Sequence, residues 1–316
     1  MVSCSPFEKY QVGQLLSLSV IPEHGEVRPV LVVRARIRQL LAPCTLSCCM
    51  IVDLLSEDYH ENTAFLKLCD RRFSDQLRDD YGIDAWTREA EKEYIDAVRT
   101  GSACQFLHEL RTIPDLEEDT GEDWNDSQIE TFLAEQARSL FDAETTVYDV
   151  LRDIQGELVP QLMERIQIVL SLPDTSSDAT DLLCIKGILL QYIEGFSLSK
   201  LQNYAPESIW QDIVNQAIAI VQIIGDHGVL NRDVRPDNFI VQHASSGCYR
   251  VFMIDFGLAR LRGSNESDRE WAKAKLIKDE EGAVGLVMKK RLAKEGFRLQ
   301  FQNSDRYMEW AGGDDE

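Results

Sequence analysis

The 316-residue sequence predicts an α+β protein of two lobes, the first rich in strands and the second rich in helices. Residues 27–70 contain short runs of Val, Ile, Leu and Cys broken by turn-like residues, a pattern typical of strands. Residues 209–225 form one long apolar segment, which indicates a buried helix. A short connector at residues 194–200, EGFSLSK, separates the two halves, so we expect lobes at 1–193 and 194–316.

Composition and charge exclude several classes of protein. Hydrophobic residues make up 44% of the chain, yet no apolar run approaches the length of a membrane span. A net charge of -21 repels nucleic acid, whose binding depends on Lys and Arg. Eight scattered cysteines and an N-terminus without a signal peptide favour reduced intracellular thiols over disulfides or a zinc site. We expect an intracellular, cytoplasmic protein, with the nucleus left open, and neither a nucleic-acid nor a membrane partner.

The first half predicts strands followed by helices. The expected strands are VRPVLVVRARI, CCMIVDLL and TAFLKLCD. The segment TREAEKEYIDAVR has the apolar spacing of a helix, with Ala90, Tyr94, Ala97 and Val98 on one face. Residues 115–126 contain seven acids and read as a solvated loop within an acidic insertion at about 71–126. A capping box of Ser127 and Glu130 should open a long helix toward Gly156.

The second half continues with a hairpin and a buried helix. RIQIVLSL and LLCIKGILLQYI predict a hairpin across the turn PDTSSDATD. Ser208 with Gln211 should cap the long apolar helix. A polar loop, NRDVRPDN, follows, and then two strands joined by the turn HASSGC. After Gly257, we expect two short helices that pack through their apolar positions (Trp271, Leu276, Ile277, Val284, Leu286, Val287, Met288 and Leu292).

Two charged residues stand in apolar surroundings. Glu144 falls on the apolar stripe of the predicted long helix, and Lys67 is flanked by Leu66 and Leu68 in a predicted strand. A buried charge is costly without a partner, so the two anomalies together suggest one buried ion pair. Taken singly, Glu144 could reach water at the edge of its stripe, and Lys67 could point outward from a half-exposed strand.

Two aspartates and an asparagine form the third feature. Asp233 and Asp255 are 22 positions apart and are linked by a predicted strand-turn-strand, which returns both carboxylates to one edge. Asn238, five positions after Asp233, adds a neutral oxygen ligand. Oxygen-only clusters of Asp and Asn suit Mg²⁺, which keeps several waters and bridges to phosphates. The tripeptide DFG alone is weak evidence, but its spacing behind D-x-x-x-x-N is specific.

These motifs resemble those of the protein-kinase-like superfamily. Lys67 is similar to the strand lysine of that family, Glu144 to its helix partner, NRDVRPDN to the catalytic loop and IDFG to the metal-binding segment. ILLQYIEG resembles the hinge between the lobes, which implies nucleotide contacts at Gln191 and Ile193. KLCDRRF, the acidic insertion and E-x-x-x-Y-x-x-L-x-x-I-Q-G more specifically resemble uncharacterised fungal kinase-like proteins with a short C-lobe.

The resemblance implies an ATP-dependent phosphotransferase with Mg²⁺ as cofactor. Asp233 would take the proton of the acceptor hydroxyl, and Arg235 would neutralise the transferred phosphoryl group. Asn238 and Asp255 would hold Mg²⁺ on ATP, while Lys67, fixed by Glu144, would bind the α- and β-phosphates. Catalysis in this class is mainly positioning and charge stabilisation. The acceptor is an unidentified hydroxyl-bearing small molecule or protein.

The sequence departs from the family pattern in four ways. Asn231 stands where the catalytic loop usually has a histidine that ties it to the DFG backbone, although Asn can also donate and accept hydrogen bonds. No glycine precedes Lys67 in LLAPCTLSCCMIVDLL, and Phe65 replaces the usual alanine over the adenine. Only 59 residues follow Gly257, too few for the usual peptide-docking lobe.

Three functions therefore stay open on the sequence alone. The first is an active kinase, whose acceptor would enter a pocket rather than lie along a groove. The second is a nucleotide-binding pseudokinase that acts as a scaffold, favoured by the missing glycines and by Asn231. The third is an interaction module that uses the acidic insertion and binds no nucleotide. Retention of all five catalytic polar residues favours the first.

Overall fold

A computed structural model describes residues 8–22, 31–55, 62–170, 181–244 and 247–308, and the chain forms two compact units. The first unit comprises residues 1–142 and 162–192, and the second comprises 143–161 and 193–316. These units differ from the lobes expected from the sequence, 1–193 and 194–316, at residue 193 and in one segment, residues 143–161. That segment joins the second unit because Leu158 accepts a backbone hydrogen bond from Met253 (2.9 Å) and Glu144 accepts one from Phe256 (3.3 Å).

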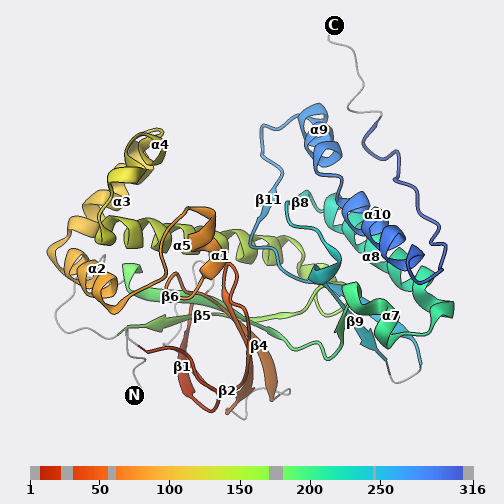
Figure 1. The fold of residues 1–316 in the computed structure, drawn as a ribbon, viewed down its shortest axis with the longest axis horizontal. Helices are drawn as coiled ribbons and strands as arrows, with labels where there is room; N and C mark the ends of the chain where they lie inside the picture. Colours follow the sequence, from red (N-terminus) through yellow and green to blue (C-terminus); the bar gives the residue numbers. More distant parts are fainter. Residues whose placement is uncertain (1–7, 23–30, 56–61, 171–180, 245–246, 309–316) are drawn as a thin grey trace, which may run out of the picture. The chain divides into compact units, whose positions relative to one another are not determined.

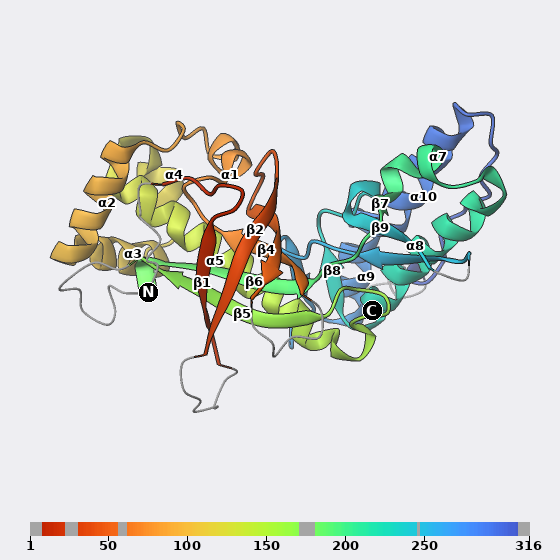
Figure 2. The same ribbon diagram turned by 90° about the horizontal axis from the view of Figure 1, so that it is seen from below.

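The first unit contains a closed antiparallel barrel of six strands in the order β1-β2-β3-β4-β6-β5 (Figures 1 and 2). Alternate side chains along each strand face the core, as in β2, where Val33, Ala35 and Ile37 are buried between exposed arginines. The strands expected within residues 27–70 are confirmed, whereas β1 was not predicted. The bounds are β1 Leu15–Val20, β2 Val32–Leu41, β3 Cys48–Leu54, β4 Thr63–Cys69, β5 Leu162–Val169 and β6 Cys184–Gln191.

β5 and β6 form the predicted antiparallel hairpin, with Ile166 opposite Gly187. Residues 171–180, which comprise the last two residues of the first expected strand and all but the last residue of the expected turn, lie outside the described residues. A Cβ on Gly187 would come within 2.5 Å of the carbonyl oxygen of Lys67, so only glycine allows β6 to approach β4 this closely. This close pairing sets the position of Lys67 opposite Ile188.

Helices fill the stretch between β4 and β5. The predicted face of α2 is confirmed, because Ala90, Tyr94, Ala97 and Val98 are buried. The described acidic side chains of the run are exposed, as expected, but the run is not a loop, since part of it folds as α4 followed by a 3₁₀ turn at Gly121–Asp123. The helix bounds are α1 Asp75–Asp80, α2 Arg88–Thr100, α3 Ser102–Thr112, α4 Leu116–Thr120 and α5 Asp126–Val150.

The predicted capping box of α5 is wrong by two residues. Asn125 caps the helix instead, because its Oδ1 accepts from the Gln128 backbone (3.0 Å) and its own N–H donates to the Gln128 side chain (3.1 Å). Glu130 is buried and binds both Arg71 and Arg78. A carboxylate that pairs with two buried guanidiniums is not available to cap a helix.

The second unit consists of helices packed with short strands. Its longest helix, α8, contacts β10 and α10. β9 and β10 form the expected hairpin, with Phe239 opposite Met253. The bounds are β7 Phe196–Ser197, α7 Leu201–Tyr204, α8 Trp210–Asp226, β8 Val229–Asn231, β9 Phe239–His243, β10 Tyr249–Met253, β11 Ala259–Leu261, α9 Asp268–Lys278 and α10 Glu280–Ala293.

Two local predictions for this unit need correction. Ser208 does not cap α8, because a 3₁₀ turn at Glu207–Ile209 takes up that position. The two helices after Gly257 are present, but only half of their apolar positions are buried. The buried positions are Trp271, Val284, Met288 and Leu292, whereas Leu276, Ile277, Leu286 and Val287 are exposed.

None of the helices in the described part of the chain combines the length and the apolar character that crossing a membrane requires.

Candidate active site

The polar loop predicted from NRDVRPDN begins at the end of β8 in the second unit. Asn231 is the last residue of β8, is buried, and lies opposite Ala259 of β11. A 3₁₀ turn at Pro236–Asn238 then leads the chain into β9. The loop is thus held at both ends by regular structure, which limits the freedom of Asp233 and Arg235 between them.

Asn231 connects this loop to the segment that carries Asp255. Its Nδ2 donates to the backbone oxygen of Asp255 (3.0 Å), while its Oδ1 accepts from the backbone N–H of Asp233 (3.0 Å). Both ends of the amide are therefore used. The sequence indicated that an asparagine could form such bonds, and the structure shows that it does.

Asn238 fixes Asp233 from the other side. Its Nδ2 donates to the Asp233 carbonyl oxygen (2.8 Å) and to the Asp233 Oδ2 (3.1 Å). The same carboxylate lies 3.3 Å from Nη2 of Arg235, whose side chain is half-exposed. The carboxylate of Asp233 is partly exposed, so it is both oriented and reachable by a substrate group.

The β9–β10 hairpin brings Asp255 back to this loop. The backbone N–H of Ile254 donates to the backbone oxygen of Asn238 (2.9 Å), directly before Asp255. Asp255 has a φ of 68°, a left-handed conformation that costs roughly 1 kcal/mol or more for a residue other than glycine. Hydrogen bonds at Asp255 and at its two neighbours, Ile254 and Phe256, hold the backbone in this conformation. Residues with such strained backbone angles are frequent at functional sites.

Glu144 of α5 contacts the segment that follows Asp255. Its Oε1 accepts from the backbone N–H of Phe256 (3.3 Å), and its side chain is buried as expected. The Phe256 ring is buried edge-to-face against Tyr148, with ring centroids 5.6 Å apart. The helix that carries Glu144 is therefore coupled to the position of Asp255 within the second unit.

The other predicted nucleotide-binding residues are divided between the units. Lys67 is buried in β4 of the first unit, and Gln191 ends β6 opposite Ala64. Ile193 is buried at the start of the main segment of the second unit. The pairing of Lys67 with Glu144 and the nucleotide contacts of Gln191 and Ile193 stay predictions.

Sequence reasoning missed two buried residues beneath the loop, Glu280 and Lys275. Glu280 accepts from the backbone N–H of Asn231 (2.9 Å) and pairs with Lys275, which also donates to the Val229 carbonyl (3.2 Å). Burial raises the pKa of Glu280, although Lys275 opposes this effect. Lys275 stands four residues after Trp271 on one face of α9, and this position on an apolar face was the signal that could have revealed it.

The oxygen atoms at this site suit Mg²⁺. No cluster of three or more His, Cys, Asp or Glu side chains that could hold a metal occurs within the described ranges. A cation here would therefore depend on Asp255 and the amide oxygen of Asn238, completed by water and phosphate oxygens. Mg²⁺ is usually bound in this way, through one or two protein oxygens and a substrate phosphate.

Comparisons with known proteins connect part of the chain to protein kinases. No protein-family model matches the sequence. A 70-residue segment, 22% of the chain, is 31% identical to a probable serine/threonine-protein kinase of Dictyostelium discoideum. A 110-residue segment, 34% of the chain, is 27% identical to a putative ribosomal protein S6 kinase alpha-2 of Caenorhabditis elegans.

Each matched segment spans only 14% of the length of the relative concerned. The chain thus has a distant, partial relationship to protein kinases. Neither relative is fungal, and the narrower resemblance to fungal kinase-like proteins has no support from these matches.

Proposed function

We propose that this protein is an ATP-dependent phosphotransferase with a kinase-like, two-lobed fold. The observation that carries the proposal is the hydrogen-bonded set of Asn231, Asp233, Asn238 and Asp255, in which two amide side chains orient the segments that hold two carboxylates. The partial similarity to protein kinases supports the same reaction class.

Each residue would contribute a distinct step. Asp233 would accept the proton of the acceptor hydroxyl while the oxygen forms its bond to the γ-phosphorus and ADP leaves. Arg235, 3.3 Å from Asp233 and half-exposed, would swing toward the transferred phosphoryl group. Asp255 and Asn238 would hold Mg²⁺, which neutralises phosphate charge when bound. Lys67 would bind the α- and β-phosphates.

The acceptor is proposed to be a small molecule rather than an extended peptide. The segment between Gly257 and α9 is short and is closed on itself, because Arg260 binds both carboxylate oxygens of Glu266 (2.8 Å each). Such a compact turn offers no long surface along which a peptide could lie beside Asp233. A protein acceptor recruited by the acidic insertion is the alternative.

A second candidate function is nucleotide binding without turnover. The turn between β2 and β3, residues 42–47, contains no glycine, so its backbone has less freedom to approach phosphates. Intact Asp233 and Asp255 favour the active enzyme over this alternative.

Thermal-shift titration with ATP and Mg²⁺, followed by an assay of ADP release, tests the proposal. Ligand that binds only the folded state must raise the melting temperature. Asp255→Asn should abolish the Mg²⁺-dependent shift, and Asp233→Asn should keep the shift but lose turnover. Asp237→Asn is the matched control, because this exposed aspartate lies in the same loop. Binding without Asp233-dependent turnover would favour the pseudokinase, and no binding at all would refute both candidates.

A further inference from the structure

The first unit contains a cavity of about 390 Å³ that the proposed phosphotransfer does not use. Its walls come from the end of β4 and the residues after it, from helices α2, α3 and α5, from β6, and from Leu170 and residues 181–183 between β5 and β6. The volume falls within the range of small-molecule sites. Every residue that lines it belongs to the first unit. The loop that carries Asp233 and the segment that carries Asp255 belong to the second unit.

The walls of this cavity are positively charged in a strongly acidic chain. Five Arg or Lys side chains line it against three carboxylates, while the whole chain has a net charge of -21. Two of the arginines, Arg71 and Arg72, are neutralised from within the fold. Arg71 binds Glu91 and Glu130, and Arg72 binds Asp70. These two therefore form an internally paired part of the wall and do not supply an anion site.

The excess charge lies where α3 and α5 face each other. Arg111 and Arg138 both bind the carboxylate of Glu135, with four N–O distances of 2.8 to 2.9 Å. Burial opposes ionisation of Glu135, but these hydrogen bonds outweigh it and lower its pKa to about 2. Two guanidiniums share one carboxylate in this group of three, and the nearby carboxylates of Asp142 and Asp181 also act on Arg138.

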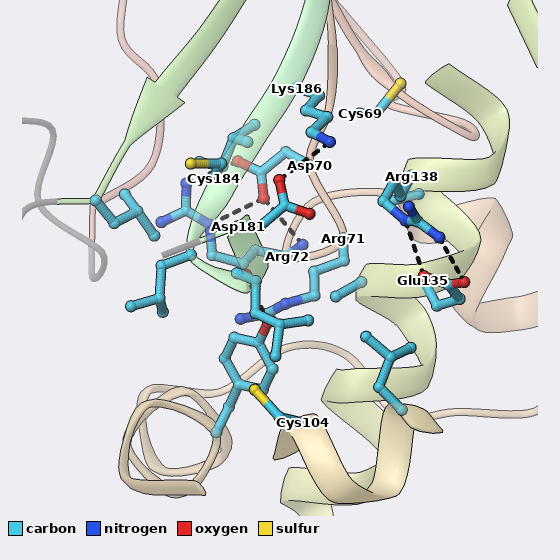
Figure 3. A pocket seen from close by; sticks show the side chains of 18 of the residues that line it. Cys69, Asp70, Arg71, Arg72, Cys104, Glu135, Arg138, Asp181, Cys184 and Lys186 are labelled. Carbon is cyan, nitrogen blue, oxygen red and sulfur yellow. Dashed lines mark hydrogen bonds and ion pairs between the residues drawn. The ribbon is translucent and has the colours of Figure 1, made fainter. Parts of the chain in front are cut away.

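A third cation, Lys186 of β6, also lines the cavity (Figure 3). Its partner is Asp181 (3.1 Å), whose side chain is 56% exposed, so this pair is a weak surface ion pair that an anionic ligand can replace. The lining also includes buried apolar side chains, among them Ala137, Leu170 and Leu183. The cavity thus combines an apolar floor with a cationic rim.

We propose that this cavity binds a small organic anion, with a phosphate or carboxylate group held by Arg111, Arg138 and Lys186 and an apolar body on the floor. Arginine side chains bind such groups through paired, charge-assisted hydrogen bonds. The apolar body gains free energy by leaving water. Because the apolar floor includes Ala137 of α5 and Leu170 and Leu183, which flank the β5–β6 connection, the ligand contacts both parts of the first unit at once.

Three probes separate the two parts of the ligand. Phenyl phosphate supplies both the ring and the anion, phenol supplies the ring alone, and inorganic phosphate supplies the anion alone. Isothermal titration of the full chain should show saturable binding that is tightest for phenyl phosphate and that weakens as NaCl is added. Benzoate tests whether a carboxylate replaces the phosphate.

Substitutions at the rim should act in opposite directions. Arg138→Gln should weaken phenyl phosphate binding about tenfold, since it removes a charge-assisted hydrogen bond. Glu135→Gln should tighten it, because both arginines are released from their shared carboxylate. A residue with only a structural role would not give this inversion. Arg99→Gln, an exposed arginine of α2 outside the cavity, is the matched control and should change nothing.

Cysteine labelling locates the bound probe. Cys104 lines the cavity, and the exposed Cys248 lies in the second unit. Phenyl phosphate should slow iodoacetamide labelling of Cys104, measured by peptide mass spectrometry, and leave Cys248 unaffected. Asp255→Asn should keep this protection, which separates the cavity from the proposed active site. No saturable binding, equal binding by Arg138→Gln, or loss of binding in Asp255→Asn would each overturn the proposal.

Discussion

Replacement of Glu280 by alanine should destabilise the second unit and release the candidate catalytic loop. Glu280 and Lys275 are each 5% exposed, so alanine would leave a buried ammonium without its carboxylate. Breaking a buried ion pair from one side costs about 3–5 kcal/mol. The backbone N–H of Asn231 also loses its acceptor, and this loss of about 1–3 kcal/mol overlaps with the first rather than adding fully to it.

Three variants divide this effect into its parts. Glu280→Gln keeps an oxygen for the Asn231 backbone but removes the charge, so it should cost less than Glu280→Ala. Lys275→Met with Glu280→Gln removes both charges and should recover part of the loss, since paired apolar or neutral replacements are often tolerated. Urea unfolding is followed by the fluorescence of the five tryptophans, of which Trp271 lies under the Lys275 ammonium at 5.7 Å and contributes the signal from this region.

Hydrogen exchange supplies the local measurement. The peptide that covers β8 and Asp233 should exchange faster in Glu280→Ala, while peptides of the first unit stay unchanged. A cost below about 1 kcal/mol, with unaltered exchange at β8, would refute the reasoning, because an ordinary surface ion pair contributes no more than that.

Other perturbations give sharp expectations. A hydrogen bond with Cys48 lowers the pKa of Cys44 to about 7 despite partial burial, so its alkylation rate should reach half-maximum near that pH and should require higher pH in Cys48→Ala. Because the pKa of Glu135 is lowered from its ordinary value of 4.5 to about 2, its ionised carboxylate stabilises the fold at pH values above 4.5. This contribution is lost as the pH falls toward about 2. The difference in unfolding free energy between wild type and Glu135→Gln should therefore shrink on acidification, measured by urea titration at several pH values. Asn231→Ala should reduce turnover while nucleotide binding survives, because the variant loses the bond from Nδ2 to the Asp255 backbone.

The sequence predicted elements whose signal lies in local periodicity. The strands within 27–70, the β5–β6 hairpin and α2 followed from spacing alone, since the side chains of a strand or helix repeat with a fixed period. β1 escaped notice because only Leu16 and Leu18 of its six residues are deeply buried. Its position depends on pairing with β2 and β5, which no short window of sequence contains.

Helix ends and exposed apolar residues were predicted less well. Asn125 and Ser127 both fit a capping pattern, and burial of Glu130 between two arginines decided in favour of Asn125. For α9 and α10, the apolar residues are spread around the helices, so the sequence could not indicate which face packs. Ile277 is 80% exposed although its side chain is as apolar as those of the packed residues. Which face of each helix is buried depends on tertiary contacts.

The candidate site shows the same division between local and tertiary information. Asp233, Asn238 and Asp255 were found from their spacing, because a hairpin between them returns the chain to one edge. Glu280 and Lys275 were missed, because their role depends on α9 and α10 lying beneath a loop about 50 residues earlier in the chain. Charged residues in such helices look like ordinary surface positions until the packing is known.

By the resemblance to the protein-kinase-like superfamily, position 231 would hold a histidine, and Asn231 makes the two side-chain hydrogen bonds expected of that position. A residue here must donate to the backbone after β10 and accept from the loop that follows it. The short amide of Asn231 does both at 3.0 Å, and Glu280 holds its backbone from below. An amide has no titratable group, so this connection does not change with pH in the range where a histidine would gain a proton. The two side-chain bonds of Asn231 should therefore be insensitive to pH between about 5 and 8, which leaves Glu280, whose pKa is raised by burial, as the titratable group that contacts Asn231 from below. Asn231→His would introduce such a dependence, and pH profiles of turnover for the two proteins would reveal it.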